Sequence, residues 1–155
     1  MSEIGKISVD ENNAPIMEFK DIKEAYNCLK VWQERLFLTD WIINLKLISY
    51  QDMLKEYGDN AGTVNFNMVN KSSTIYLTIP DEEVKSRIVK YCAEKTLIHE
   101  LLHLKYNWVV NENDTIPNLY YDTLEHGLIE QMAKSLIMAK YNLPHSWFVN
   151  FTEEE

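Results

Sequence analysis

Hydrophobic and polar positions recur with two different periods along the chain, and these periods predict where helices and strands lie. From Asp21 to about Phe37, apolar residues fall at the three- and four-residue intervals of an amphipathic helix, with Asp21 as its N-cap. From Trp41 to Ile48, apolar residues alternate with more polar ones, which is typical of a strand with one buried face. The first part of the chain is therefore predicted to form a helix followed by a strand.

A pair of alternating segments follows a turn-forming cluster at residues 57–62. The segments at 63–69 and 74–79 both have a period of two, and the polar residues 70–73 lie between them. Two such segments around a short polar turn predict an antiparallel hairpin. Together with the earlier strand they make a small, antiparallel-rich sheet of three strands, or of four if the N-terminal segment adds one.

The rest of the chain has helical periodicity. Pro80 and the acidic residues after it are a helix-start signal, because the helix dipole favours negative charge in the first turn. The helical pattern continues to about Trp108, with room for a break near Tyr91. After a polar loop, a last major helix is expected from about Leu119 to Tyr141. Its expected buried stripe consists of Leu124, Leu128, Met132 and Leu136.

This order of elements predicts an α+β protein with one domain. Hydrophobic residues make up 46% of the 155 residues, which is enough for a single core. We expect residues 1–17 to be a flexible leader, residues 18–150 to form the folded domain, and residues 151–155 to be a solvated acidic tail.

Composition and charge narrow the choice of partners. The net charge is −9, whereas proteins that bind a phosphate backbone usually present a basic surface. The sequence has neither a long apolar segment nor the features of a secretory signal, and Cys28 and Cys92 are far apart in it. We therefore expect a cytoplasmic protein without a nucleic-acid or membrane partner.

One motif carries recognisable chemistry, the segment His99-Glu100-Leu101-Leu102-His103. On a helix, His99 and His103 share one face and can bind one metal ion, while Glu100 lies on the flank of that face. Zinc held by three protein ligands keeps a position for water and lowers the pKa of that water to about 7. Glu100 can then accept a proton from the water and deliver it to a leaving amine.

A second segment on the last predicted helix, from Glu125 to Ala133, completes a resemblance. Together with the motif it resembles the gluzincin branch of zinc metallopeptidases, and more closely its small cytoplasmic and phage-associated members. In that family, a zinc ligand on the helix after the motif is followed four residues later by an acid, which hydrogen-bonds the first motif histidine. The resemblance implies a zincin-like fold, a Zn²⁺ cofactor and a peptide or protein substrate.

The resemblance leaves two candidates for the third zinc ligand. One frame makes His126 the ligand and Glu130 the acid that orients His99, whereas the family usually has glutamate at the ligand position. Glu125 would restore that residue type, so it stays the alternative, although a residue four positions on from it, Ile129, gives it no polar support. Gly127 has two explanations: a close approach of this helix to the motif helix, or a glycine that the helix simply tolerates.

The leading interpretation is a zinc-dependent metallopeptidase in which Glu100 acts as general base and acid. The 63–79 hairpin resembles the family's substrate-binding strand. The alternative is a zinc-binding scaffold or interaction module of the same fold with little or no proteolytic activity. The presence of Glu100 favours the enzyme, because a purely structural zinc site needs no base.

Overall fold

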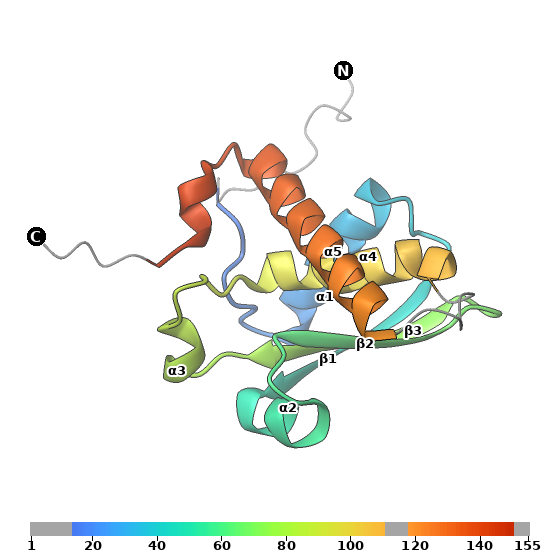
Figure 1. Cartoon of the computed structure of the whole chain (residues 1–155), viewed down its shortest axis with the longest axis horizontal. Helices are drawn as coiled ribbons and strands as arrows, with labels where there is room; N and C mark the ends of the chain where they lie inside the picture. The colour runs from blue at the N-terminus through green and yellow to red at the C-terminus, as the bar shows by residue number, and fades with distance from the viewer. Residues whose placement is uncertain (1–13, 111–117, 151–155) are drawn as a thin grey trace, which may run out of the picture.

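The computed structural model describes residues 14–110 and 118–150, with side chains described for 14–106 and 123–150, and it confirms a mixed α+β architecture. A small sheet has α1, α4 and α5 on one face and α2 on the other (Figure 1). The elements are α1 (Ile22–Arg35), β1 (Ile42–Ser49), α2 (Tyr50–Tyr57), β2 (Gly62–Asn67), β3 (Ser72–Ile79), α3 (Glu82–Lys85), α4 (Ala93–Val110), α5 (Asn118–Tyr141) and a 3₁₀ helix (His145–Phe148).

The sheet has the strand order β1-β3-β2, so the last strand in sequence is the central one. Strands β2 and β3 form the predicted antiparallel hairpin, in which Val64 lies opposite Ile75. Strand β1 pairs with β3 in parallel, with Leu45 opposite Ile75. The sheet is therefore mixed rather than antiparallel-rich, because the chain crosses over through α2 and β2 before it returns beside β1. The described residues add no fourth strand to it.

Helix α1 begins and ends through local hydrogen bonds. Asp21 Oδ1 accepts a hydrogen bond from the Glu24 backbone N–H at 2.8 Å, which confirms the predicted cap. At the other end, the Leu38 N–H reaches the Gln33 carbonyl at 2.8 Å and the Phe37 N–H reaches that of Glu34 at 3.3 Å, the pairing of a Schellman motif. Phe37 occupies the left-handed position of this motif (φ 62°), and 87% of it is exposed.

Helix α2 was not predicted from the sequence. Ser49 Oγ caps it by accepting from the Asp52 N–H at 3.1 Å, and Gly58, with φ 91°, ends it. Only Tyr50 and Met53 of this helix are buried, which is too few to give a periodic signal. The long helical region that follows is broken as expected: α3 ends at Lys85 and α4 begins at Ala93.

Helix α5 is present, but the predicted buried stripe was wrong at Leu124 and Leu128, whereas Met132 and Leu136 are half-buried against the core. Leu124 and Leu128 are 52% and 56% exposed, and the fully buried positions are Ile129, Ala133 and Ile137. Both sets of residues repeat at four-residue intervals, so periodicity alone did not decide which stripe faces the core. No helix in the described part of the chain combines the length and apolar character needed to cross a membrane.

The start of α4 is fixed by a buried carboxylate. Glu94 is fully buried and accepts hydrogen bonds from the Ile16 backbone N–H, the Trp32 indole, the Lys140 ammonium and the Tyr141 hydroxyl, at 2.7–3.1 Å. It thereby joins the end of the predicted leader, α1 and α5 to one point. Residues 1–13 of that leader and the predicted acidic tail at 151–155 lie outside the described residues.

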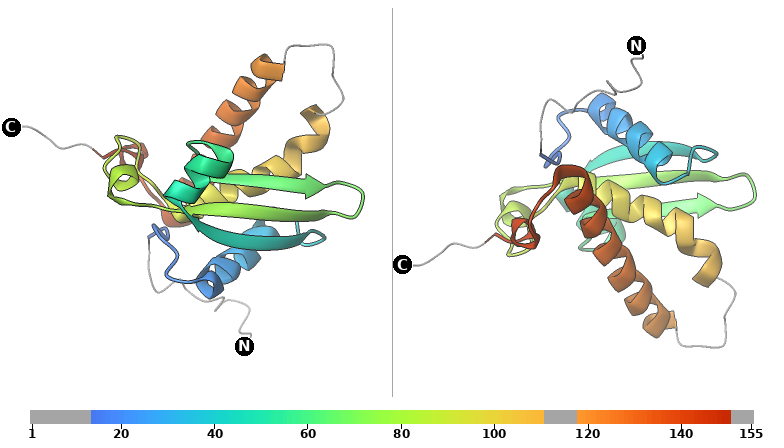
Figure 2. Two further views of the ribbon diagram at one scale, coloured as in Figure 1. Left: turned by 90° about the horizontal axis from the view of Figure 1, so that it is seen from below. Right: turned by 90° about the horizontal axis from the view of Figure 1, so that it is seen from above.

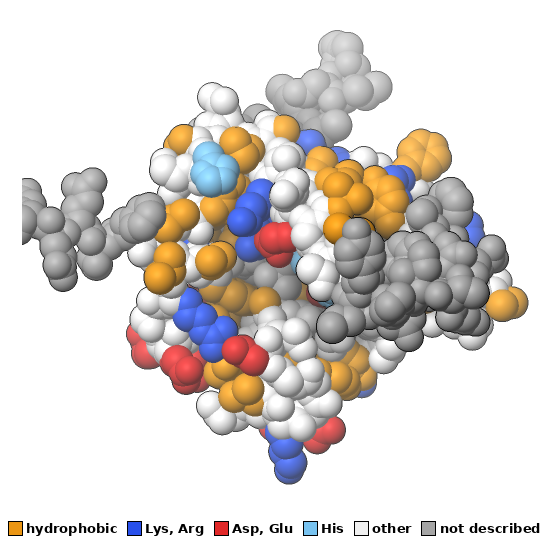
Figure 3. Space-filling model, in the orientation of Figure 1, with side chains coloured by type: hydrophobic (Ala, Val, Ile, Leu, Met, Phe, Trp, Pro, Cys, Tyr) orange, Lys and Arg blue, Asp and Glu red, His pale blue; other side chains and the backbone are white. Residues whose placement is uncertain are grey.

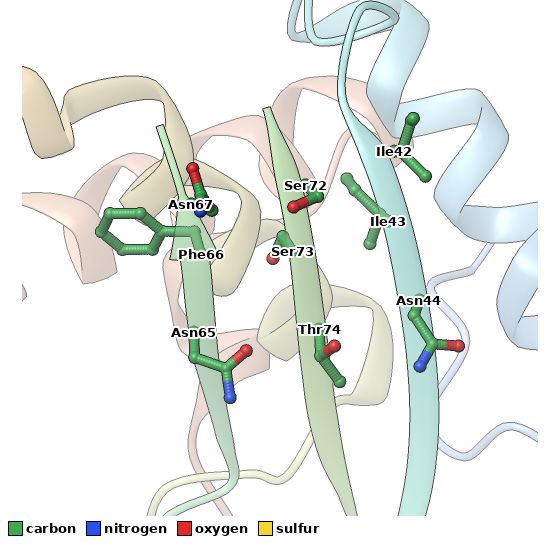
Figure 4. Close-up of a pocket in the computed structure, with 9 residues that line it drawn as sticks. All are labelled: Ile42, Ile43, Asn44, Asn65, Phe66, Asn67, Ser72, Ser73 and Thr74. Carbon is green, nitrogen blue, oxygen red and sulfur yellow. The ribbon is translucent and has the colours of Figure 1, made fainter. Parts of the chain in front are cut away.

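The second face of the sheet is covered only in part. Figure 2 shows α2 lying over one end of the strands, and beyond it lies a hollow of about 720 Å³ (Figure 4). Asn44, Thr74 and Asn65 form one row across the three strands there. The lining has no histidine, cysteine, acid or base. This hollow therefore lacks the residue types needed for acid–base or metal chemistry. The histidines and acids of the motif lie on the other face of the sheet.

Candidate metal centre

Three histidines from two helices converge between α4 and α5, which lie side by side (Figures 1 and 2). His99 and His103 come from α4, and His126 comes from α5. One ligand atom from each histidine lies within 4.8 Å of the others. The ring centroids are 5.1 Å apart for His99–His103, 5.7 Å for His99–His126 and 4.8 Å for His103–His126. The structure thus brings together the three residues of the preferred ligand frame.

Two carboxylates of α5 orient the rings of α4. Glu130 Oε2 lies 3.0 Å from His99 Nδ1, and Glu125 Oε1 lies 3.4 Å from His103 Nδ1. An ionised carboxylate accepts a hydrogen bond from Nδ1–H, which fixes the tautomer with the lone pair on Nε2. Both α4 histidines therefore have Nε2 available for a metal ion. The predicted contact between Glu130 and His99 is present.

Glu125, the alternative third ligand, contacts a histidine of the motif instead of joining the group of ligand atoms. Its carboxylate contacts the ring of His103, and the compact group of ligand atoms found among the described residues consists of the three histidines. Glu125 is thus placed as Glu130 is, against the Nδ1 atom of a motif histidine. The geometry favours His126 over Glu125 as the third ligand.

Glu100 is a buried carboxyl group beside the histidines. Only 5% of Glu100 is exposed, and burial raises its pKa to about 7, with His99 opposing this rise and Glu130 adding to it. A carboxyl group with a pKa near neutrality can both accept and donate a proton, as a general base and acid must.

Glu130 and His103 have the charge states that a cation site needs. Burial alone would raise the pKa of Glu130, but the hydrogen bond from His99 and the charge of Lys95 lower it to about 2. Burial, with the charges of His99 and His126, lowers the pKa of His103 to about 4. At neutral pH, Glu130 is therefore ionised and His103 is neutral, which is the form that binds metal.

The start of β2 closes the site on one side. A Cβ atom at Gly62 would lie 2.9 Å from Thr96 Cγ2, 3.2 Å from Glu100 Cγ and 3.2 Å from the Tyr76 carbonyl oxygen. Only glycine lets the strand approach α4 this closely. At Gly127, by contrast, a Cβ atom would lie in open space, so of the two explanations the structure supports a tolerated glycine and not a close approach.

A hollow of about 230 Å³ opens beside the histidines. Its lining comes from α4, α5 and the segment that leads into β2: Asp59, Asn60, Ala61, Gly62, Lys95, Thr96, His99, Glu100, His126 and Glu130. The Asp59 carboxylate is bound by the Tyr50 hydroxyl at 2.9 Å and by Arg87 at 3.1 Å, which fixes this segment. Figure 3 shows basic and acidic side chains next to one another on the face that it draws.

Sequence reasoning did not single out Lys95 and Gly62. Lys95 lies four residues before His99 and so shares its face of α4, a signal that the helical spacing already contained. Gly62 belonged to the turn-forming cluster, and nothing in that cluster indicated contact with a helix 34 positions later, at Thr96.

The histidine cluster fits a zinc ion in its donor set. Three neutral imidazoles form a known zinc-binding set, and tetrahedral zinc with bonds of about 2.0–2.1 Å holds its nitrogens about 3.3 Å apart. The observed ligand atoms lie within 4.8 Å of one another, so binding of zinc would draw the three rings closer together. Comparisons of the chain with protein-family models, with curated proteins and with solved structures found no match.

Proposed function

We propose that this protein is a zinc-dependent metallopeptidase of zincin-like, gluzincin-type architecture. The observation that carries the proposal is the convergence of His99, His103 and His126 beside the buried carboxyl group of Glu100. A purely structural zinc site needs four protein ligands and no neighbouring base. Here three histidines converge and a carboxyl group with a near-neutral pKa accompanies them.

Each residue of the site has a separate part in peptide hydrolysis. A bound zinc ion would lower the pKa of water and polarise the substrate carbonyl group. His99, His103 and His126 would hold it, with Glu130 and Glu125 fixing the two α4 rings. Glu100 would accept a proton from the attacking water as the C–O bond forms. It would then donate that proton to the amine as the C–N bond breaks.

Strand β2 supports an extended peptide as the substrate. Among the described strands, β2 pairs with β3 alone, so its other edge has no strand partner. Its first residue, Gly62, contacts α4 at Glu100 and lines the hollow beside the histidines. A peptide that added itself to this edge would bring its backbone carbonyl groups past the site.

The experiment compares the wild type with Glu100→Gln, which keeps the shape of the side chain and removes the base. Both proteins are stripped with a chelator and reloaded with Zn²⁺, and bound zinc and cleavage of a mixed peptide library are measured. We expect both to bind zinc, and Glu100→Gln to cleave at least roughly 100-fold more slowly. Zinc binding with equal, background cleavage in both proteins would favour the scaffold, and failure of the wild type to bind zinc would refute both.

A further inference from the structure

We propose that Lys95 is a positioning residue of the metal centre: it holds Glu130 so that this carboxylate presents its second oxygen to His99. The inference rests on the proposed function, since it concerns how the same site is prepared for its ion. Lys95 is 8% exposed and lies one helical turn before His99 on α4.

Both oxygens of the Glu130 carboxylate are in contact with side chains of α4. Lys95 Nζ lies 2.8 Å from Glu130 Oε1, while His99 Nδ1 lies 3.0 Å from Glu130 Oε2. Rotation of the carboxylate would break both contacts together. Lys95 therefore limits the directions in which Glu130 can accept a hydrogen bond, and so limits the orientation of the His99 ring.

The positive charge of Lys95 compensates the negative charge on the buried Oε1 atom of Glu130. Oε1 is buried and makes no hydrogen bond of good geometry within the described residues, so the nearby ammonium group acts on it as an ion pair. Without that charge, the carboxylate would gain by turning towards water and would leave His99.

Packing alone does not require a lysine at this position. Helix α5 already packs into the core through Ile129, Ala133 and Ile137. The Lys95–Glu130 pair is partly buried, so desolvation offsets part of its Coulomb energy, and apolar residues of similar volume are often as stable at such positions. The Lys95–Glu130 pair is thus better explained by its contact with His99 than by the joining of two helices.

The test measures zinc affinity rather than turnover. Lys95→Met keeps most of the side-chain volume and removes the charge, and Lys95→Arg restores the charge. Lys105→Met is the matched control, because Lys105 is on the same helix and its ammonium donates to the Leu36 carbonyl at 2.8 Å, away from the histidines. Affinity is read by competition with a chromophoric chelator, the cobalt-loaded proteins are compared by absorption spectrum, and thermal unfolding checks the fold.

We expect Lys95→Met to weaken zinc binding roughly 10- to 100-fold and to change the cobalt spectrum, with Lys95→Arg recovering part of the loss. Lys105→Met should stay within about twofold of the wild type, because it contacts no group of the site. Should Lys95→Met fail to fold, Lys95→Gln carries the same expectation with a polar side chain in place.

A double-mutant cycle decides whether Lys95 acts through Glu130. In a Glu130→Gln background, Lys95→Met should change zinc affinity by less than about threefold, because the group that it positions is gone. An equal loss in both backgrounds overturns the inference. Wild-type zinc affinity in Lys95→Met overturns it while the proposed function stands, and a wild type that binds no zinc overturns both.

Discussion

Glu125 Oε1 lies 3.4 Å from Nδ1 of His103 and so faces the ring nitrogen that a metal ion would not use. Glu130 stands in the same relation to His99, at 3.0 Å. The two acids of α5 thus serve the two histidines of α4 in the same way. This arrangement leaves His126 as the residue of α5 whose ring nitrogens lie with those of the motif.

The first prediction separates His126 from Glu125 by zinc affinity. His126→Ala removes a proposed ligand and should weaken zinc binding by more than about 100-fold, whereas Glu125→Gln keeps an oxygen for His103 Nδ1 and should lose about tenfold or less. Competition with a chromophoric chelator measures both. A larger loss in Glu125→Gln than in His126→Ala would make Glu125 the ligand.

The second prediction concerns pH and the buried carboxyl group. Glu100 has an ordinary pKa of 4.5 in the unfolded chain and one of about 7 in the folded protein. The folded state therefore holds a proton that the unfolded state has lost between these values. The stability that this proton gives is complete below pH 4.5 and is lost as the pH rises through 7.

The glutamine of Glu100→Gln cannot ionise, so the stability of this variant should not fall with pH in this way. Between pH 4.5 and 8, the free energy of unfolding of the metal-free variant should rise relative to the wild type by about 3 kcal/mol. Urea unfolding of chelator-treated proteins at the two pH values measures the difference. A difference between the two proteins that does not change with pH would show that Glu100 titrates normally.

The third prediction contrasts two glycines. Gly62→Ala would place a methyl group 2.9 Å from Thr96 Cγ2 and 3.2 Å from the Tyr76 carbonyl, which is backbone, so we expect a loss of about 1–3 kcal/mol. Gly127→Ala places its methyl group in open space beside α5, and the higher helix propensity of alanine should raise the free energy of unfolding by about 1 kcal/mol. Thermal unfolding of both variants is the measurement, and equal shifts in one direction would contradict it.

These glycines illustrate what the sequence could and could not predict. The motif at 99–103 and the partner segment at 125–130 were recognisable because helical spacing fixes which side chains share a face. The contact of Gly62 with Glu100 depends on how a strand packs on a helix, which no local pattern encodes. The parallel pairing of β1 with β3 likewise depends on the path of the chain through α2, whose few buried residues gave no signal.

The fourth prediction concerns Glu94, outside the site. Glu94→Gln keeps the volume of the side chain but removes the charge that faces Lys140, at 3.1 Å in a buried setting. Loss of one partner of a buried ion pair should cost about 3 kcal/mol, and the melting temperature should fall by roughly 10 °C. Glu18→Gln, at a solvent-exposed pair with Lys85, is the control and should change stability by less than about 1 kcal/mol.

The central position of β3 has a consequence for the order in which the molecule assembles. Ile75 contacts a near neighbour in sequence, Val64, on one side and a distant one, Leu45, on the other. Short loops close at lower entropic cost, so we expect the hairpin in the folding transition state and β1 to dock later. In stopped-flow kinetics, Val64→Ala should then mainly slow refolding, and Leu45→Ala should mainly speed unfolding.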